Sequence, residues 1–223
     1  MPQGCWPPGA YEVPMNVTRR LLFVTFLTCV RIPLVFIFFA GALADSLTGR
    51  AHSSLFYAAF ACLVVATVTD MLDGYYARKL EVTTKLGACA DPLSDKVFYL
   101  TTLPLLVFLA TRNTHITHAV VLLCLTVSLL LRDQWVSFLR SVGASCENVN
   151  LGANWSGKLR TAINFPLICL IYYREGTDNP CVGAALLYVF EAGALVMNFV
   201  SFVIYTRQYW PHLKKSLDIT PPR

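Results

Sequence analysis

The sequence predicts an all-α integral membrane protein: a bundle of six transmembrane helices preceded by a short N-terminal interfacial segment. Of its 223 residues, 56% are hydrophobic and only 14% are charged, and the mean hydropathy is +0.55. A soluble domain carries about 25% charged residues. Apolar runs of about 20 residues match the thickness of a bilayer core. No Gly/Ser-rich or highly charged linker interrupts these runs, so one compact membrane domain is expected.

The chain divides into three parts by composition. Residues 1–15, rich in Pro and Gly, predict an irregular lead-in, residues 16–210 the membrane domain, and residues 211–223 a cytoplasmic tail. Within the second part, residues 16–23 change from polar and basic to apolar, which fits an interfacial segment that continues into the first membrane helix. The predicted membrane runs are 21–43, 53–73, 91–111, 117–139, 159–174 and 182–205.

The first helix carries a charge in an unusual place, because Arg31 lies within the apolar run and is followed by Pro33. One interpretation is an arginine whose guanidinium extends to the cytoplasmic surface, with a local kink at the proline. The other is an arginine that faces buried carboxylates, as a counter-charge or a phosphate ligand. The sequence leaves both open.

The distribution of basic residues predicts the orientation in the membrane. Those on one predicted side are Arg19, Arg20, Arg78, Lys79, Lys85, Arg140, Lys158, Arg160, Arg207, Lys214 and Lys215. The opposite loops contain only Arg50, Arg112 and Arg174. The positive-inside rule therefore places both termini in the cytoplasm, for a bacterial inner membrane by default or a mitochondrial one. Since the basic residues lie at membrane edges and not in one stripe, no nucleic-acid partner is expected.

Four carboxylates lie around the connection between the second and third helices. Asp70 and Asp73 end one run, and Asp91 and Asp95 begin the next, each pair about one helical turn apart. Two antiparallel helices joined by a short loop lie side by side, so all four side chains can converge. Charges at membrane depth are costly and usually functional. Oxygen ligands of this kind suit two Mg²⁺ or Mn²⁺ ions that clamp a phosphate.

Small and basic residues accompany these carboxylates. Gly74 and Ala77 leave room for a bulky ligand against the second helix, and Arg78 can bind a phosphate with its guanidinium. An ion-relay or transport protein is the alternative for paired membrane carboxylates.

A second basic cluster is predicted where the fourth helix ends and the fifth begins. Arg132 and Arg140 lie on adjoining faces of the fourth helix, and Lys158 and Arg160 lie at the N-terminal end of the fifth. Backbone amides at a helix N-terminus also favour anions. The cluster predicts a second phosphate site, although Lys158 and Arg160 alone would be ordinary interfacial anchors. The four histidines show no metal-ligand spacing, and no chemistry is expected of them.

The complete pattern from Asp70 to Asp95, including Gly87, resembles the signature of the CDP-alcohol phosphotransferase family. The resemblance covers residues 16–209 and implies transfer of a phosphatidyl group from CDP-diacylglycerol to an alcohol, with release of CMP. It implies that Asp70, Asp73, Asp91 and Asp95 bind two divalent ions and that Asp95 is also the general base. It implies nucleotide contacts from Asp70, Gly74, Ala77, Arg78 and Gly87. A homodimer is also expected from the family.

The acceptor is predicted from the basic cluster. Arg132-Asp133 and Gly157-Lys158-x-Arg160-Thr161 are similar to the pattern of phosphatidylglycerophosphate synthases, which bind the phosphate of glycerol 3-phosphate. Arg31, Arg132, Arg140, Lys158 and Arg160 are the predicted ligands of the acceptor phosphate. CMP-forming cardiolipin synthase and phosphatidylinositol (phosphate) synthase stay open as alternatives. A non-catalytic lipid-binding or transport protein is a more remote one.

Overall fold

The computed structural model describes residues 15–49, 53–80, 85–147, 155–177 and 183–217, and in these ranges all regular structure is helical. The helices are α1 (Met15–Leu47), α2 (Ser53–Leu80), α3 (Lys85–Arg112), α4 (Ile116–Glu147), α5 (Trp155–Gly176) and α6 (Ala184–Leu217). The side chains of residues 15–25, 73–80, 85–92 and 158, among others near the helix ends, lie outside the described part. The predicted all-helical membrane fold is confirmed.

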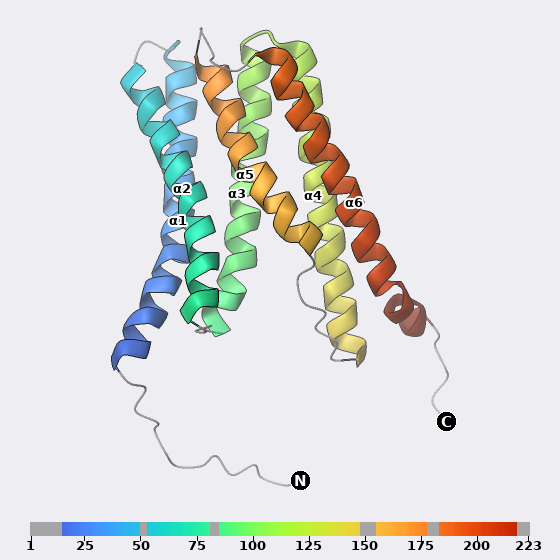
Figure 1. Cartoon of the computed structure of the whole chain (residues 1–223). Helices are drawn as coiled ribbons and strands as arrows, with labels where there is room; N and C mark the ends of the chain where they lie inside the picture. The colour runs from blue at the N-terminus through green and yellow to red at the C-terminus, as the bar shows by residue number, and fades with distance from the viewer. Residues whose placement is uncertain (1–14, 50–52, 81–84, 148–154, 178–182, 218–223) are drawn as a thin grey trace, which may run out of the picture.

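Five of the helices are long and apolar enough to cross a membrane. These spans are Cys29–Leu47, Ser54–Leu72, Leu93–Arg112, Ile116–Gly143 and Ala184–Pro211. The sixth predicted span corresponds to α5, which is not among the five but lies alongside them in the bundle (Figure 1). Its buried Arg160, Asn164 and Glu175 lower its apolar character.

The helices are longer than the apolar runs that predicted them. The predicted interfacial segment forms the first turns of α1, which is continuous from Met15. Similarly, α2 continues to Leu80 and α3 begins at Lys85, so their connection is shorter than predicted. A helix does not end where its apolar residues end, because polar residues can continue the backbone hydrogen bonds beyond the bilayer core.

Helix contacts define a closed ring in the order α1, α2, α5, α6, α4 and α3. One further contact, between α3 and α5, crosses the interior of this ring. The bundle is elongated, and α1 begins at the same end at which α6 ends (Figure 1). The ring therefore has two halves, α1–α2–α3 and α4–α5–α6, which meet where α3 contacts α4 and α5 and where α2 contacts α5.

The apolar core joins the two halves through aromatic side chains. The ring of Tyr172 on α5 lies 4.9 Å from that of Phe38 on α1 and 5.2 Å from that of Phe56 on α2, between centroids. Gly176 lies directly against Phe56, where a Cβ would overlap the ring. Such edge and stacked contacts stabilise a core beyond the burial of area alone.

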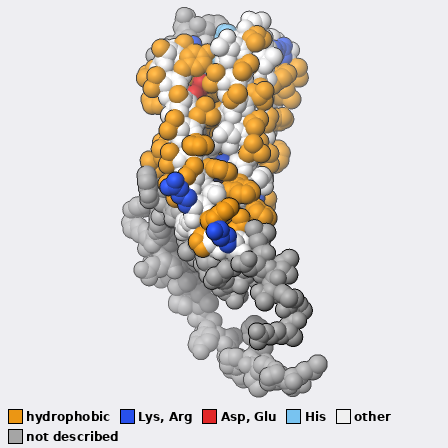
Figure 2. Space-filling view, turned by 90° about the vertical axis from the view of Figure 1, so that its right-hand side faces the viewer, with side chains coloured by type: hydrophobic (Ala, Val, Ile, Leu, Met, Phe, Trp, Pro, Cys, Tyr) orange, Lys and Arg blue, Asp and Glu red, His pale blue; other side chains and the backbone are white. Residues whose placement is uncertain are grey.

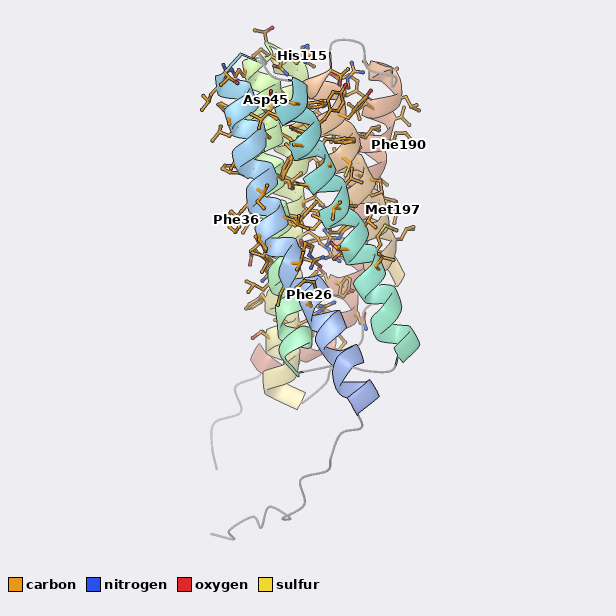
Figure 3. The ribbon with its side chains drawn as sticks, turned by 90° about the vertical axis from the view of Figure 1, so that its left-hand side faces the viewer. Phe26, Phe36, Asp45, His115, Phe190 and Met197 are labelled. Atoms are coloured by element: carbon orange, nitrogen blue, oxygen red, sulfur yellow. The ribbon has the colours of Figure 1, made fainter. Side chains whose placement is uncertain are left out.

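The outer surface is apolar, as expected for contact with lipid. Hydrophobic side chains cover most of the face shown in Figure 2, and basic side chains stand out toward its lower end. Phe36 on α1 and Phe190 and Met197 on α6 lie on the periphery of the bundle (Figure 3). This surface has no counterpart in a water-soluble monomer, which rarely exposes large contiguous apolar patches.

A buried polar network lies at the end of the bundle marked by His115 in Figure 3. His118 Nδ1 lies 2.7 Å from Glu175 Oε1, and His118 Nε2 lies 2.8 Å from Glu191 Oε1. Asn113 donates a 2.7 Å hydrogen bond to Glu175 Oε2. The network thus joins α4, α5 and α6 through hydrogen bonds.

Candidate active site

One group of buried charges lies in the α1–α2–α3 half of the ring. Arg31 is completely buried, and its guanidinium forms an ion pair with Asp70 of α2. The guanidinium nitrogen that faces Asp70, Arg31 Nη1, also lies 3.2 Å from Asp95 Oδ1 of α3. Of the two interpretations of Arg31, the one in which it faces the carboxylates is therefore correct. The alternative, an arginine that extends to the surface, is wrong, because the buried guanidinium contacts two acids from neighbouring helices.

The carboxylate group fits a divalent cation in its chemistry. Asp70 and Asp95 come from different helices and share one guanidinium nitrogen, so their oxygens can approach a single cation. Among the described side chains, no group of three or more His, Cys, Asp or Glu residues has a metal-binding arrangement. The side chains of Asp73 and Asp91, the other two predicted ligands, lie outside the described residues.

The predicted nucleotide-binding residues fall at the same helix ends. Gly74, Ala77 and Arg78 belong to the last turns of α2, and Gly87 belongs to the first turn of α3. Their side-chain positions lie outside the described residues, so their roles stay predictions.

A second group of charges lies in the α4–α5–α6 half. Arg132 and Arg140 of α4 both lie over the ring of Tyr205 on α6, at 4.9 and 5.5 Å from its centroid. Arg140 also donates a 3.3 Å hydrogen bond to Tyr205 Oη, and Arg132 donates to Ser201 Oγ. Cation–π contacts of this kind are favourable when the ring is desolvated, and Tyr205 is buried.

Asp133 connects this cluster to α5. Its Oδ1 accepts from Arg132 Nη1 at 2.9 Å and lies 3.0 Å from Arg160 Nη2. The structure thus brings together three of the predicted basic residues, Arg132, Arg140 and Arg160. The side chain of Lys158 lies outside the described residues. With three guanidinium groups and one carboxylate, the cluster retains positive charge for an anion.

Tyr205 and Ser201 are parts of this cluster that the sequence did not reveal. Both lie one helical turn apart on α6, within an apolar run that looks purely structural. Gly157 allows the close approach of α5, because a Cβ at this position would lie 3.1 Å from Tyr205 Oη. The spacing of Ser201 and Tyr205 on one helix face is the signal that could have indicated them.

Together, the fold and the two clusters define a multi-pass α-helical membrane protein with paired acidic and basic sites inside its bundle. The family model described as CDP-alcohol phosphatidyltransferase matches residues 22–207. The chain belongs to this family, as the Asp70–Asp95 pattern predicted.

Known relatives agree with this family and differ in their named reactions. Cardiolipin synthase (CMP-forming) of Oryza sativa subsp. japonica is 32% identical over 162 residues, which are 68% of this chain and 48% of the relative. CDP-diacylglycerol--glycerol-3-phosphate 3-phosphatidyltransferase 1, chloroplastic/mitochondrial, of Arabidopsis thaliana is 33% identical over 206 residues, 89% of this chain and 66% of the relative. The CDP-diacylglycerol--glycerol-3-phosphate 3-phosphatidyltransferase of Pseudomonas fluorescens is 32% identical over 164 residues, which are 71% of this chain and 78% of the relative.

The chain spans about half the length of the rice relative and 66% of the length of the Arabidopsis one. Both glycerol-3-phosphate transferases match a larger share of this chain than the rice cardiolipin synthase does.

Proposed function

We propose that the protein transfers a phosphatidyl group from CDP-diacylglycerol to a hydroxyl of glycerol 3-phosphate, giving phosphatidylglycerophosphate and CMP. The observation that carries the proposal is the pair of oppositely charged clusters in the two halves of one bundle. Carboxylates on α2 and α3 suit a metal-bound diphosphate, and guanidinium groups on α4 and α5 suit a second phosphate. A reaction between two phosphate-bearing substrates needs both.

On the donor side, Asp70, Asp73, Asp91 and Asp95 would hold two Mg²⁺ or Mn²⁺ ions. When bound, such ions would neutralise the phosphate charge and favour departure of CMP. Arg78 would bind the phosphates of the nucleotide. Gly74, Ala77 and Gly87 would allow the nucleotide to lie close to the helix backbones.

Asp95 would accept the proton of the acceptor hydroxyl. The hydroxyl oxygen then attacks the lipid-side phosphorus, and the bond from that phosphorus to the bridging oxygen breaks with its electron pair on CMP. The contact of Asp95 Oδ1 with Arg31 Nη1, at 3.2 Å, orients the carboxylate.

On the acceptor side, the cluster of Arg132, Arg140, Lys158 and Arg160 would bind the phosphate of glycerol 3-phosphate. Tyr205 and Asp133 hold the described arginines in place by contacts that need no substrate. Arg31 is proposed as an additional ligand of the acceptor phosphate. Because it pairs with Asp70, it would reach that phosphate from the acidic cluster.

The experiment is CMP release by the purified protein with CDP-diacylglycerol and Mg²⁺. Glycerol 3-phosphate, phosphatidylglycerol, inositol 1-phosphate, inositol and serine would be supplied in parallel. Release that depends on glycerol 3-phosphate supports the proposal, and release with another acceptor only would replace it. No release with any acceptor would favour a lipid-binding or transport protein.

A second candidate function is CMP-forming cardiolipin synthesis, with phosphatidylglycerol as the acceptor. An apolar groove of about 480 Å³ lies between α5 and α6 and is lined by residues including Ala162, Pro166, Phe190 and Met197. The groove begins two residues beyond Arg160, so the acyl chains of a lipid acceptor would have an apolar surface next to the basic cluster. The same acceptor panel distinguishes this function from the first.

We also propose that both ends of the described chain face the cytoplasm. Helix α1 begins and helix α6 ends at the same end of the bundle. The segments predicted on this side carry most of the basic residues. A membrane-impermeant label should therefore reach a cysteine at Lys214 in inside-out vesicles and one at Thr114 in right-side-out vesicles. The reverse pattern would refute this orientation. The homodimer and the choice between a bacterial and a mitochondrial inner membrane stay predictions.

A further inference from the structure

The contact between α3 and α5 brings four polar side chains to the boundary of the two clusters. On α3, Asp95 and Tyr99 are one helical turn apart, and on α5 the same is true of Arg160 and Asn164. Each helix thus offers one charged group of the candidate site and one neutral group beyond it. Since α3 and α5 meet across the interior of the ring, the neutral pair lies at the contact between the half that holds the acidic cluster and the half that holds the basic one.

The neutral pair is deeply buried, and among the described residues only its two members are indicated as hydrogen-bond partners, each for the other. Tyr99 and Asn164 are each 1% exposed. Within the described residues, Tyr99 Oη, both amide atoms of Asn164, and Arg160 Nε and Nη1 form no hydrogen bond of ordinary geometry. More than nine in ten buried polar groups in proteins are hydrogen-bonded, so several unused atoms at one place indicate a ligand.

Contacts around Tyr99 fix the position of this polar group. The guanidinium of Arg160 lies over the Tyr99 ring at 5.6 Å from its centroid, and the ring of Phe165 packs against it at 5.6 Å. Asp95 lies one helical turn before Tyr99 on α3, and Asp133 lies 3.0 Å from Nη2 of the same Arg160. The phenol is therefore held between the proposed base and the basic cluster.

The chemistry of the pair favours a hydroxyl as its ligand. A phenol and a carboxamide can each donate and accept, and both are neutral, whereas the flanking groups are charged. Accordingly, a phosphate suits the guanidinium groups, and an uncharged hydroxyl suits Tyr99 and Asn164.

We propose that Tyr99 and Asn164 bind the non-reacting hydroxyl of a phosphorylated diol acceptor. This inference rests on the proposed function. In glycerol 3-phosphate, one terminal hydroxyl attacks, the other end carries the phosphate, and the middle carbon carries the remaining hydroxyl. With the attacking hydroxyl at Asp95 and the phosphate at the basic cluster, the middle hydroxyl falls between them. Tyr99 and Asn164 are then specificity-determining residues that select a diol over a simple alcohol.

The test compares glycerol 3-phosphate with 3-hydroxypropyl phosphate, which lacks only the middle hydroxyl. A site that hydrogen-bonds a substrate hydroxyl rejects the analogue without it, because its own buried polar groups are then left unpaired. For the unmodified protein, we expect kcat/KM for CMP release to be about 100-fold higher with glycerol 3-phosphate. Equal use of the two acceptors by the unmodified protein would overturn the inference.

Two variants with side chains of similar size test whether Tyr99 and Asn164 cause the preference for glycerol 3-phosphate. Tyr99→Phe and Asn164→Leu should each reduce the preference to about 10-fold or less, mainly by lowering kcat/KM for glycerol 3-phosphate. Tyr172→Phe, a matched change at a buried tyrosine that contacts Phe38 and Phe56, should leave it unchanged. An undiminished preference in both Tyr99→Phe and Asn164→Leu would overturn the assignment, while no CMP release with either acceptor would overturn the proposed function itself.

Discussion

At the scale of single residues, the candidate site depends on arginines that each contact several groups. Arg31 bridges Asp70 and Asp95, and Arg132 contacts Asp133, Ser201 and the ring of Tyr205. A planar guanidinium with five donors can do this, whereas a lysine ammonium cannot reproduce its geometry. These arginines therefore contribute to the fold as well as to the chemistry.

Replacement of Arg31 should destabilise the bundle. Arg31→Gln would leave Asp70 and Asp95 without their shared counter-charge, at a cost of about 3–5 kcal/mol in the free energy of unfolding. Thermal unfolding in detergent measures this effect. The exposed Arg207→Gln is the matched control, expected within about 0.5 kcal/mol of the unmodified protein. Equal unfolding temperatures for the two variants would argue against the buried ion pairs.

Replacement of Asp95 should separate chemistry from binding. Asp95→Asn removes the proposed base but keeps the size of the side chain, so CMP release should fall by about 100-fold or more. Binding of CDP-diacylglycerol, measured by calorimetry, should be largely retained. Loss of binding with turnover intact would refute the assignment of Asp95 as the base.

At the scale of helices, close packing decides where the basic cluster forms. Gly157 lets the start of α5 approach Tyr205 of α6, and Tyr205 in turn holds Arg132 and Arg140. The position of these arginines thus depends on a helix contact, and not only on their own sequence neighbours.

A methyl group at position 157 should disturb this contact. In Gly157→Ala, the new Cβ would lie 3.1 Å from Tyr205 Oη, which is closer than an ordinary van der Waals contact. We expect the KM for glycerol 3-phosphate to rise about 3- to 10-fold, since overpacking of this kind typically costs about 1–3 kcal/mol. Gly193→Ala on α6, with no neighbouring atom within 4 Å, is the control and should leave this KM unchanged. Similar KM values for both variants would show that the contact does not position the cluster.

The polar network of α4, α5 and α6 makes the stability of the bundle depend on pH through Glu175. Burial raises the pKa of Glu175, but hydrogen bonds from His118 and Asn113 and the charge of His118 outweigh it and hold that pKa at about 2, below the ordinary 4.5. A depressed carboxyl pKa contributes stability that is present above pH 4.5 and is lost as the pH falls toward 2.

Glu175→Gln should reveal this contribution. At pH 7 the free energy of unfolding of the variant should be about 3 kcal/mol lower than that of the unmodified protein, because His118 loses one of its two carboxylate partners. The difference should shrink progressively below pH 4.5. Unfolding temperatures over a pH series measure it, and a difference independent of pH would contradict the role of the ionised carboxylate.

The sequence predicts the helices well but their partners poorly. Long apolar runs mark each helix, because a bilayer requires hydrogen-bonded backbone and apolar side chains over a fixed length. The same runs hide buried groups such as Tyr205 and Glu191, whose partners lie on other helices. Arg31 is the clearest case: its position in the chain was compatible with two orientations, and its contacts with Asp70 of α2 and Asp95 of α3 decide between them.

At the scale of the whole molecule, the acidic and basic clusters lie in different halves of the ring of helices, and the contact of α3 with α5 joins these halves across its interior. The acidic cluster belongs to α1, α2 and α3, and the basic cluster to α4, α5 and α6. Helices adjacent in sequence are expected to pack together, so the sequence predicts that α2 and α3 lie side by side. That prediction is wrong for the described residues: α2 and α3 do not contact each other but flank α1, and Arg31 of α1 joins Asp70 to Asp95. The contact of α3 with α5 is not predictable in this way, because it joins elements separated by an entire membrane crossing.

The central claim is that the two halves of the ring bind different substrates, and Arg140→Gln tests it most directly. Arg140 belongs to the basic half only, where it contacts Tyr205. Steady-state kinetics of CMP release should show a KM for glycerol 3-phosphate raised about 10- to 100-fold, as expected for the loss of one charge-assisted hydrogen bond. The KM for CDP-diacylglycerol should be unchanged. An equal rise in both values would contradict separate donor and acceptor sites.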